Sequence, residues 1–474
     1  MRATILSCLA LTLAATDRAG AQRAAQPDWA AVEAETMQHF QALLRLDTSD
    51  PPGNERAAVD YLKQVLEREG IAVQVFALEP HRPNLVARIT GNGSRRPLLI
   101  MGHTDVVNVD PAKWTHPPFS ATREGGYVYG RGAVDDKDNV VASLMTMLLL
   151  KRLNVPLDRD VVFLAESGEE GSTRVGIQFM TREHYKVLDA EYCLAEGGAA
   201  ARVGGRVRYA GVSTTEKIPR AIELTARGPA GHGSVPLQGN AILRLSQAIA
   251  KIGAWRTPVA LNPTTRTYFQ RLATLTSGDS ARRYRDIVSG DSAKVAAVDA
   301  YFMRNEPSHA SVIRTSVSPN IVQGGYRVNV IPSEAKATLD VRMVPGEDTA
   351  AFVETLKRVI NDPAITVAYA QRDVRPQTPH ANLDTEAFRA IEAAVTRHYS
   401  TVTLPVMLTG ATDMAYLRAR GMQCYGIGPA FDVEDAPKGF GAHSDQERIL
   451  ESELHRFVKF QYDIVERLAR SRQP

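Results

Sequence analysis

The chain has 474 residues, a formal net charge of +3 and 44% hydrophobic residues. This length predicts two domains, or one domain with a large insertion, and the composition is typical of a soluble globular protein. No run of Lys or Arg stands out, so the charge pattern gives no basis for binding nucleic acid or an anionic membrane surface.

The first residues predict an exported protein. Arg2 precedes an apolar stretch from Ile5 to Ala15, and the small residues Ala19, Gly20 and Ala21 follow it. This order is typical of a secretory signal peptide over residues 1–21, with the mature protein periplasmic or secreted. A membrane anchor is the alternative, but the stretch is too short for a bilayer, which needs about 20 apolar residues. No membrane span is expected after signal removal.

Cysteine usage limits the metal chemistry. After signal removal only Cys193 and Cys424 remain, and the sequence contains no C-x-x-C motif. Two cysteines do not make a disulfide scaffold, and neither redox chemistry nor a thiolate zinc site is indicated. Any metal must therefore be held by His and carboxylate side chains.

Hydrophobic periodicity predicts an α/β catalytic domain interrupted by an inserted domain. In residues 22–211, short β-rich apolar runs alternate with longer helical segments, which predicts a mostly parallel sheet flanked by helices. In residues 212–372, "AIELTARG" and "AKATLDVRMV" alternate apolar and polar residues, as antiparallel strands with one solvated face do. We predict an inserted α+β lid or dimerisation domain there, and the second part of the catalytic domain in residues 373–474.

Polar residues follow predicted strands at points where α/β sheets bind ligands. The run "LLIMGHTDVV" places His103 after a buried strand, with Asp105 positioned to orient its ring. In "YGRGAVDDKDN", Asp135 and Asp136 repel each other unless a cation shares their charge, so one of them is a candidate bridging ligand. Taken singly, each pair also fits a solvated loop or a helix N-terminus.

Three further segments supply acids and a second histidine. "VVFLAESGEEGST" ends a strand in Glu166, Glu169 and Glu170, where one Glu can bind metal while its neighbour accepts a proton from water. Glu196 follows another apolar strand, and His443 lies in the glycine-rich loop "GFGAHSDQE". A solvated acidic loop and an ordinary loop histidine are the simpler alternatives for each segment alone.

Together these motifs resemble the dinuclear-zinc metallopeptidase family that contains glutamate carboxypeptidase, carboxypeptidase S, aminoacylase, carnosinase and succinyl-diaminopimelate desuccinylase. The resemblance runs from "LLRLDTSDPPGNE" to "GAHSDQE". It implies two Zn²⁺ ions per chain, with Co²⁺ or Mn²⁺ as substitutes, a cis peptide bond after the bridging Asp, and Glu169 as the general base that activates water. The implied metal ligands are His103, oriented by Asp105, together with Asp135 as the bridge, Glu170, Glu196 and His443.

The resemblance also implies residues that contact the substrate. "RGPAGHGSVP" is similar to a lid motif whose histidine contacts the oxyanion, often from the partner subunit, which nominates His232 and a homodimer formed through the inserted domain. Asn329 and Arg342 match residues that grip a substrate carboxylate, and Gly410 lies in another substrate-side loop. Residues 255–317 make the lid longer than in the shortest members of the family, in the region where relatives pair.

Three functions follow as hypotheses. The first is a metallocarboxypeptidase that hydrolyses the amide bond next to a free C-terminal carboxylate. The second keeps the chemistry but takes an N-acyl amino acid, as an aminoacylase does, or a dipeptide. The third is a non-catalytic binding protein, against which Glu169 argues because binding alone needs no base beside a metal ligand.

Overall fold

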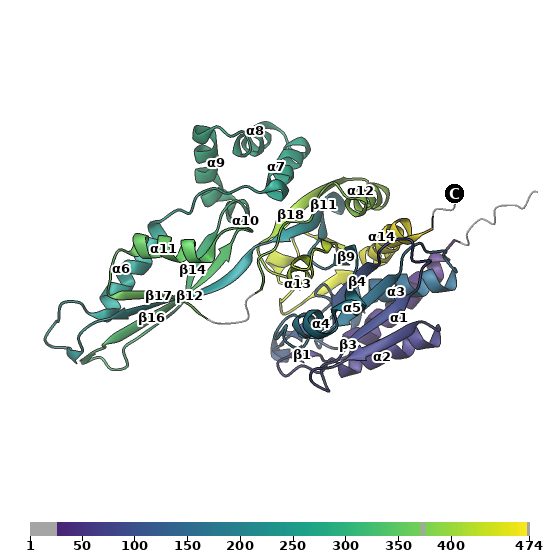
Figure 1. Cartoon of the computed structure of the whole chain (residues 1–474), viewed down its shortest axis with the longest axis horizontal. Helices are drawn as coiled ribbons and strands as arrows, with labels where there is room; N and C mark the ends of the chain where they lie inside the picture. The colour runs from purple at the N-terminus through teal and green to yellow at the C-terminus, as the bar shows by residue number, and fades with distance from the viewer. Residues whose placement is uncertain (1–25, 371–374, 472–474) are drawn as a thin grey trace, which may run out of the picture.

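The computed structural model describes residues 26–370 and 375–471, so the predicted signal peptide lies outside the described residues (Figure 1). Figure 1 shows a large lobe built on one sheet, a smaller lobe with its own sheet, and a group of helices above them. The chain is mixed α/β, with a central sheet flanked by helices.

The large lobe contains a ten-stranded sheet in the order β2-β3-β8-β4-β9-β19-β11-β10-β20, with β18 beside β11. Pairing is parallel through the centre, from β8 to β19, and antiparallel at β2–β3–β8 and where β11 meets β10 and β19. Its strands are β2 (Ala72–Phe76), β3 (Asn84–Ile89), β4 (Leu98–His103), β8 (Val161–Glu166), β9 (Tyr192–Ala195), β10 (Ala199–Val203), β11 (Arg206–Glu216), β18 (Val402–Leu408), β19 (Gln423–Gly426) and β20 (Ala430–Asp432).

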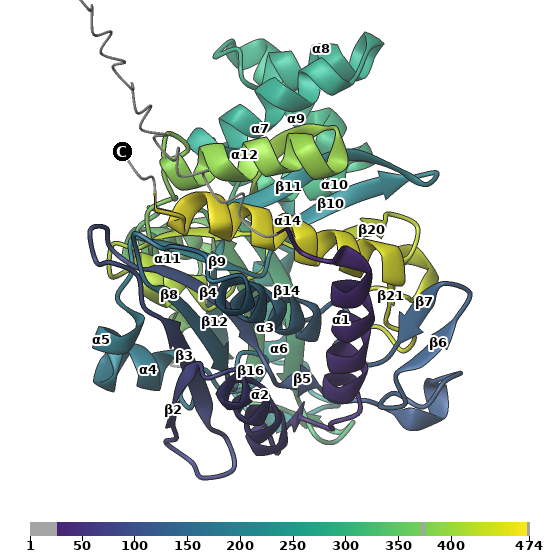
Figure 2. The same cartoon turned by 90° about the vertical axis from the view of Figure 1, so that its right-hand side faces the viewer.

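Continuous apolar runs form the central strands because both faces of the sheet are covered. Along β4, Leu98 and Ile100 pack into one core, while Leu99 and Met101 pack into another on the opposite face. Helices α1 (Trp29–Leu44), α2 (Arg56–Arg68), α3 (Lys137–Arg152), α12 (Glu386–Tyr399) and α14 (Glu451–Ala469) contribute to the first core, and α4 (Ile177–Glu183), α5 (Tyr185–Leu188) and α13 (Met414–Arg418) to the second. Figure 2 shows α1, α3 and α14 gathered along one side of the sheet.

The smaller lobe contains an antiparallel sheet in the order β14-β16-β12-β17. Its strands are β12 (Ile218–Arg227), β14 (Ser316–Gly324), β16 (Glu334–Met343) and β17 (Ile365–Tyr369). Burial alternates along β12 and β16, and the buried residues face helices α6 (Ala241–Ala254) and α11 (Thr349–Ile360). The two alternating segments of the sequence therefore pair with each other as antiparallel strands with one covered face.

Helices α7 (Pro263–Leu275), α8 (Gly278–Ile287), α9 (Ser292–Asn305) and α10 (Pro307–Val312) form a separate group. They enclose a core that also contains Leu404 of β18, so this insertion packs against the large sheet. The predicted boundary after residue 211 falls inside β11, which stays in the large sheet up to Glu216. The boundary after residue 372 lies outside the described residues, and the division into domains stays a prediction.

Short strands complete the described chain. These are β1 (Ser49–Asp50), β5 (Val106–Val107), β6 (Thr122–Glu124), β7 (Tyr127–Tyr129), β13 (Gly231–His232), β15 (Val330–Ile331) and β21 (Arg448–Leu450), with 3-10 helices at Pro111–Lys113 and Ala436–Lys438. Within residues 26–370 and 375–471, no helix has both the length and the apolar character needed to cross a bilayer.

Candidate metal centre

Three neighbouring parallel strands bring three of the predicted ligands to one edge of the large sheet. His103 ends β4, Glu170 follows β8 and Glu196 follows β9. The pairs β4–β8 and β4–β9 are parallel, so their carboxyl ends meet at the same edge, which is where open α/β sheets bind ligands. Asp135 precedes α3, and His443 lies in the loop before β21.

These five side chains form two candidate metal groups that share Asp135. One group is His103, Asp135 and Glu196, and the other is Asp135, Glu170 and His443, with ligand atoms in each group within 4.8 Å of one another. Asp135 Oδ1 lies 3.1 Å from His103 Nε2, while Oδ2 lies 3.1 Å from His443 Nε2. The two carboxylate oxygens thus face different groups, as a bridging ligand requires. The peptide bond between Asp135 and Asp136 is cis, as the resemblance implied.

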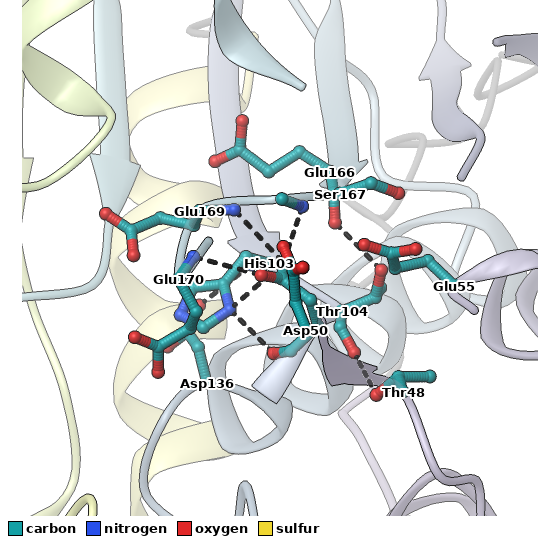
Figure 3. Close-up of polar contacts among 12 residues, drawn as sticks. Thr48, Asp50, Glu55, His103, Thr104, Asp136, Glu166, Ser167, Glu169 and Glu170 are labelled. Carbon is teal, nitrogen blue, oxygen red and sulfur yellow. Dashed lines mark hydrogen bonds and ion pairs between the residues drawn. The ribbon is translucent and has the colours of Figure 1, made fainter. Parts of the chain in front are cut away.

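Asp105 orients the ring of His103 through its backbone carbonyl, and its carboxylate has a second role that the sequence did not reveal. The ring of His103 donates from Nδ1 to the backbone carbonyl of Asp105 at 2.9 Å, whereas the nearest carboxylate oxygen is 3.6 Å away. The Asp105 carboxylate accepts backbone N–H groups from Gly168, Glu169 and Glu170 at 2.8, 3.2 and 2.9 Å. Figure 3 shows Glu169 and Glu170 on this loop, close to His103. The carboxylate therefore fixes the loop that carries Glu169 and Glu170, and the Asp105 carbonyl leaves His103 Nε2 facing Asp135.

Two buried acids to which the sequence motifs gave no role accept hydrogen bonds from the backbone that carries the ligands. The buried Asp136 accepts the backbone N–H of His103 through Oδ2 at 3.1 Å. The buried Glu447 accepts the backbone N–H groups of Gly132 and Val134 at 3.1 and 2.8 Å and pairs with Arg131 at 2.6 Å. Both sets of contacts hold the segment before α3 in place, and Asp135 is carried on that segment.

The electrostatics of the cluster favour a bound cation. Burial raises the pKa of Glu196 well above its usual range, and neighbouring carboxylates add to the rise. Hydrogen bonds to Asp135 and Glu170 raise the pKa of His443 to about 10. Although burial opposes it, hydrogen bonds from His103 and His443 hold the pKa of Asp135 below its usual range. A field that stabilises an imidazolium this strongly will also stabilise a divalent cation held by the same groups.

The donor set fits a pair of borderline divalent ions. It consists of two imidazoles and three carboxylates, and Cys193 and Cys424, the two cysteines among the described residues, are buried elsewhere in the sheet. Imidazole nitrogen and carboxylate oxygen suit Zn²⁺ and also accept Co²⁺ or Mn²⁺. Three protein ligands per group leave open positions, which is typical of catalytic metal sites.

Glu169 lies beside this cluster and has a partner that the sequence did not reveal. Its Oε1 accepts a charged hydrogen bond from Arg375 Nη2 at 2.8 Å, and Arg375 Nη1 lies 2.9 Å from Asp413 Oδ1. Burial raises the pKa of Glu169, and the guanidinium of Arg375 opposes that rise. Arg375 belongs to "RDVRPQTPH", which carries no recognisable motif, so no sequence signal could have found it.

Two of the predicted substrate residues, His232 and Asn329, lie far from the metal groups of their own chain. His232 is exposed in β13, which pairs with β15 just after Asn329. Both residues lie beyond the end of β12 that is remote from the large sheet, roughly 30 Å along a ten-residue strand. Arg342 lies at the opposite end of β16, opposite Pro219, so Asn329 and Arg342 do not form a clamp together in this chain. Gly410 follows β18 in the loop that also carries Thr412 and Asp413.

Paired ligand groups with a shared carboxylate, beside a buried glutamate at a sheet edge, are an arrangement typical of metal-dependent hydrolases. Comparison with protein families agrees, because residues 99–467 match the model described as Peptidase family M20/M25/M40. The chain belongs to this family of hydrolases.

Relatives within the family differ in their named activities. The chain is 28% identical over 331 residues to probable carboxypeptidase S-like 2 of Dictyostelium discoideum. This match covers 68% of the chain and 62% of the relative, so the chain spans less than two thirds of that relative's length. It is 26% identical to human aminoacylase-1 over 82% of this chain and 86% of that protein. A solved M20 metallo-carboxypeptidase from Sulfolobus solfataricus has a similar fold, with a TM-score of 0.66, 20% identity and coverage of 91% and 98% of the two chains.

Proposed function

We propose that the chain is a dinuclear zinc amidohydrolase of carboxypeptidase type, which hydrolyses an amide bond next to a free carboxylate. The single observation that supports this most is the position of Asp135, which belongs to both ligand groups. Glu169 directly precedes the candidate ligand Glu170 in the same loop. When bound, the paired ions would lower the pKa of a water and polarise the amide carbonyl.

The chain's own residues account for the proton transfers in this proposal. Glu169 is buried beside the ligand groups. Burial raises its pKa towards neutral pH, and a general base works best when its pKa is near the working pH. We infer that Glu169 accepts the proton of the attacking water and returns it to the departing amine. Arg342, which is about one third exposed, has the planar fork that suits a substrate carboxylate.

Hydrolysis of N-acyl amino acids is the second candidate. The match to human aminoacylase-1 covers more of both chains than the match to the carboxypeptidase S-like protein, which supports this substrate class. Both substrates present a free carboxylate to the same residues. Turnover of blocked dipeptides compared with N-acetyl amino acids, with each released amino acid identified by mass, distinguishes the two candidates.

The decisive experiment for the mechanism is Glu169→Gln. The amide keeps the size of the side chain but cannot accept a proton as a base, so we expect the variant to bind metal as the wild type does while hydrolysis is abolished. Retained hydrolysis would refute the assignment of Glu169. If the metal-loaded wild type turns over neither substrate class, both candidate functions are wrong.

We also propose a homodimer in which His232 and Asn329 act on the partner's site, because neither reaches the ligand groups of its own chain. Co-expression of an inactive His232→Ala chain with an inactive Glu169→Gln chain should restore hydrolysis, since one site of each mixed dimer would be intact. No restoration of hydrolysis in demonstrated mixed dimers would contradict the proposed homodimer.

Export is likewise a proposal. If the signal peptide is removed as proposed, N-terminal sequencing of the secreted protein should begin at Gln22.

A further inference from the structure

Glu169 is held by an ion pair that is almost enclosed by protein. The side chains of Glu169 and Arg375 are 9% and 14% exposed, and Arg375 Nη2 lies 2.8 Å from Glu169 Oε1. The same nitrogen also lies 3.5 Å from the backbone carbonyl oxygen of Glu169. A guanidinium that contacts both the carboxylate and the backbone of one residue restricts the rotation of that side chain.

The guanidinium is shared with a second, fully buried acid. Arg375 Nη1 lies 2.9 Å from Oδ1 of Asp413, whose side chain is 1% exposed. One cation therefore stands between two carboxylates, and Asp413 balances the charge that Arg375 brings to Glu169. Because only Oε1 of Glu169 meets Arg375, the other carboxylate oxygen can serve as the proton acceptor.

Arg375 is also tied to the smaller lobe. Its backbone carbonyl accepts a hydrogen bond from Arg220 Nη1 at 3.1 Å, and Arg220 lies on β12. The guanidinium of Arg220 lies 5.9 Å from the ring centroid of Tyr369, the last residue of β17. The backbone of Arg375 is thus bonded to Arg220 of the smaller lobe, while its side chain reaches Glu169 of the large lobe.

We propose that Arg375 is a positioning residue that aligns Glu169 for proton transfer and links its alignment to the smaller lobe. This inference rests on the proposed function of Glu169. The hydrogen bonds and ion pairs of Arg375 are with Glu169, Asp413 and Arg220, and none is with a member of the two ligand groups, so its contribution is to the orientation of the base rather than to metal binding. Misplacement of a reacting group by about 1 Å can cost on the order of 100-fold in rate.

The test compares Arg375→Met, Arg375→Lys and Arg202→Met in metal-loaded full-length protein. Arg202 is a matched control, because its side chain is 18% exposed and also lies between two carboxylates, Asp432 at 3.3 Å and Glu453 at 3.9 Å. For Arg375→Met we expect kcat to fall about 10- to 100-fold with KM and metal content close to the wild type. Arg375→Lys should recover part of kcat, because an ammonium can meet one carboxylate but not bridge both.

Either of two kinetic results would overturn the proposal. One is a kcat for Arg375→Met equal to that of Arg202→Met, and the other is a rise in KM or a loss of metal with kcat unchanged. The thermal midpoint of unfolding tests the pair without requiring activity. If Arg375 and Glu169 are paired, the shift of the double variant relative to the wild type should differ from the sum of the shifts of Arg375→Met and Glu169→Gln. Additive shifts would contradict the pairing itself, whereas an inactive wild type with non-additive shifts would contradict only the proposed function.

Discussion

Substitution of Asp105 by Asn tests how the loop that carries Glu169 and Glu170 is held. The wild-type carboxylate is fully buried and accepts two backbone N–H groups on Oδ1, from Gly168 and Glu169, and one on Oδ2, from Glu170. An amide has one oxygen, which keeps the first two bonds if it takes the Oδ1 position. Its NH₂ group then faces the N–H of Glu170, where one charge-assisted bond is lost.

The cost follows from that single lost bond. A hydrogen bond to a charged group contributes about 1.5 to 3 kcal/mol, and 1.4 kcal/mol is about a factor of ten in an equilibrium constant. We therefore expect Asp105→Asn to weaken metal binding at the site of Glu170, or to lower kcat/KM, by about 10- to 100-fold. Titration of the metal-free variant with Zn²⁺, together with kcat/KM at saturating metal, measures both effects. Wild-type values for both would refute the role given to the Asp105 carboxylate.

Two pH-dependent predictions concern stability away from the metal centre. Arg152 contacts Glu35 at 2.6 and 2.9 Å, and this contact, together with that of His39, lowers the pKa of Glu35 to about 2. The pair should therefore add about 1 kcal/mol to the free energy of unfolding above pH 4.5, and this contribution should be lost as pH falls towards 2. Unfolding by urea should show Glu35→Gln less stable than the wild type at pH 6, with the gap closing towards pH 3; a constant gap would contradict this. Burial lowers the pKa of Lys217 to about 8, below its unfolded value, so the unfolded chain binds more protons and this group adds stability as pH rises from about 8 to 10.5. Relative to Lys217→Met, the wild type should gain up to roughly 3 kcal/mol across that window, and parallel curves would exclude the shift.

The sequence could place three of the five candidate ligands at one sheet edge because each of the three follows a strand whose apolar run is unambiguous. His103, Glu170 and Glu196 lie after β4, β8 and β9, and parallel pairing brings them to one edge. Asp135 could be chosen over Asp136 only through the resemblance, since the two adjacent acids look alike in the sequence. The structure separates them, because Asp135 faces both ligand groups and Asp136 turns towards the backbone of His103.

Long-range contacts account for what the sequence could not predict. Arg375 meets Glu169 across 206 residues, and no periodicity or motif marks such a pair. Spacing placed Asp105 near the ring of His103, which its carbonyl contacts, but could not show that its carboxylate holds the loop of Glu169 and Glu170. The separation of Asn329 from Arg342 follows from the length of β16, which a motif match does not measure.

Metal stoichiometry of Asp135→Asn tests the central claim most directly. The wild type, loaded with Zn²⁺ and freed of excess ion, should hold two ions per chain if Asp135 stands between two sites. Because an amide cannot supply two anionic oxygens to two ions, Asp135→Asn should weaken both sites together, whereas His443→Asn should weaken one. An Asp135→Asn protein that is folded and still holds both ions as tightly as the wild type would contradict the account.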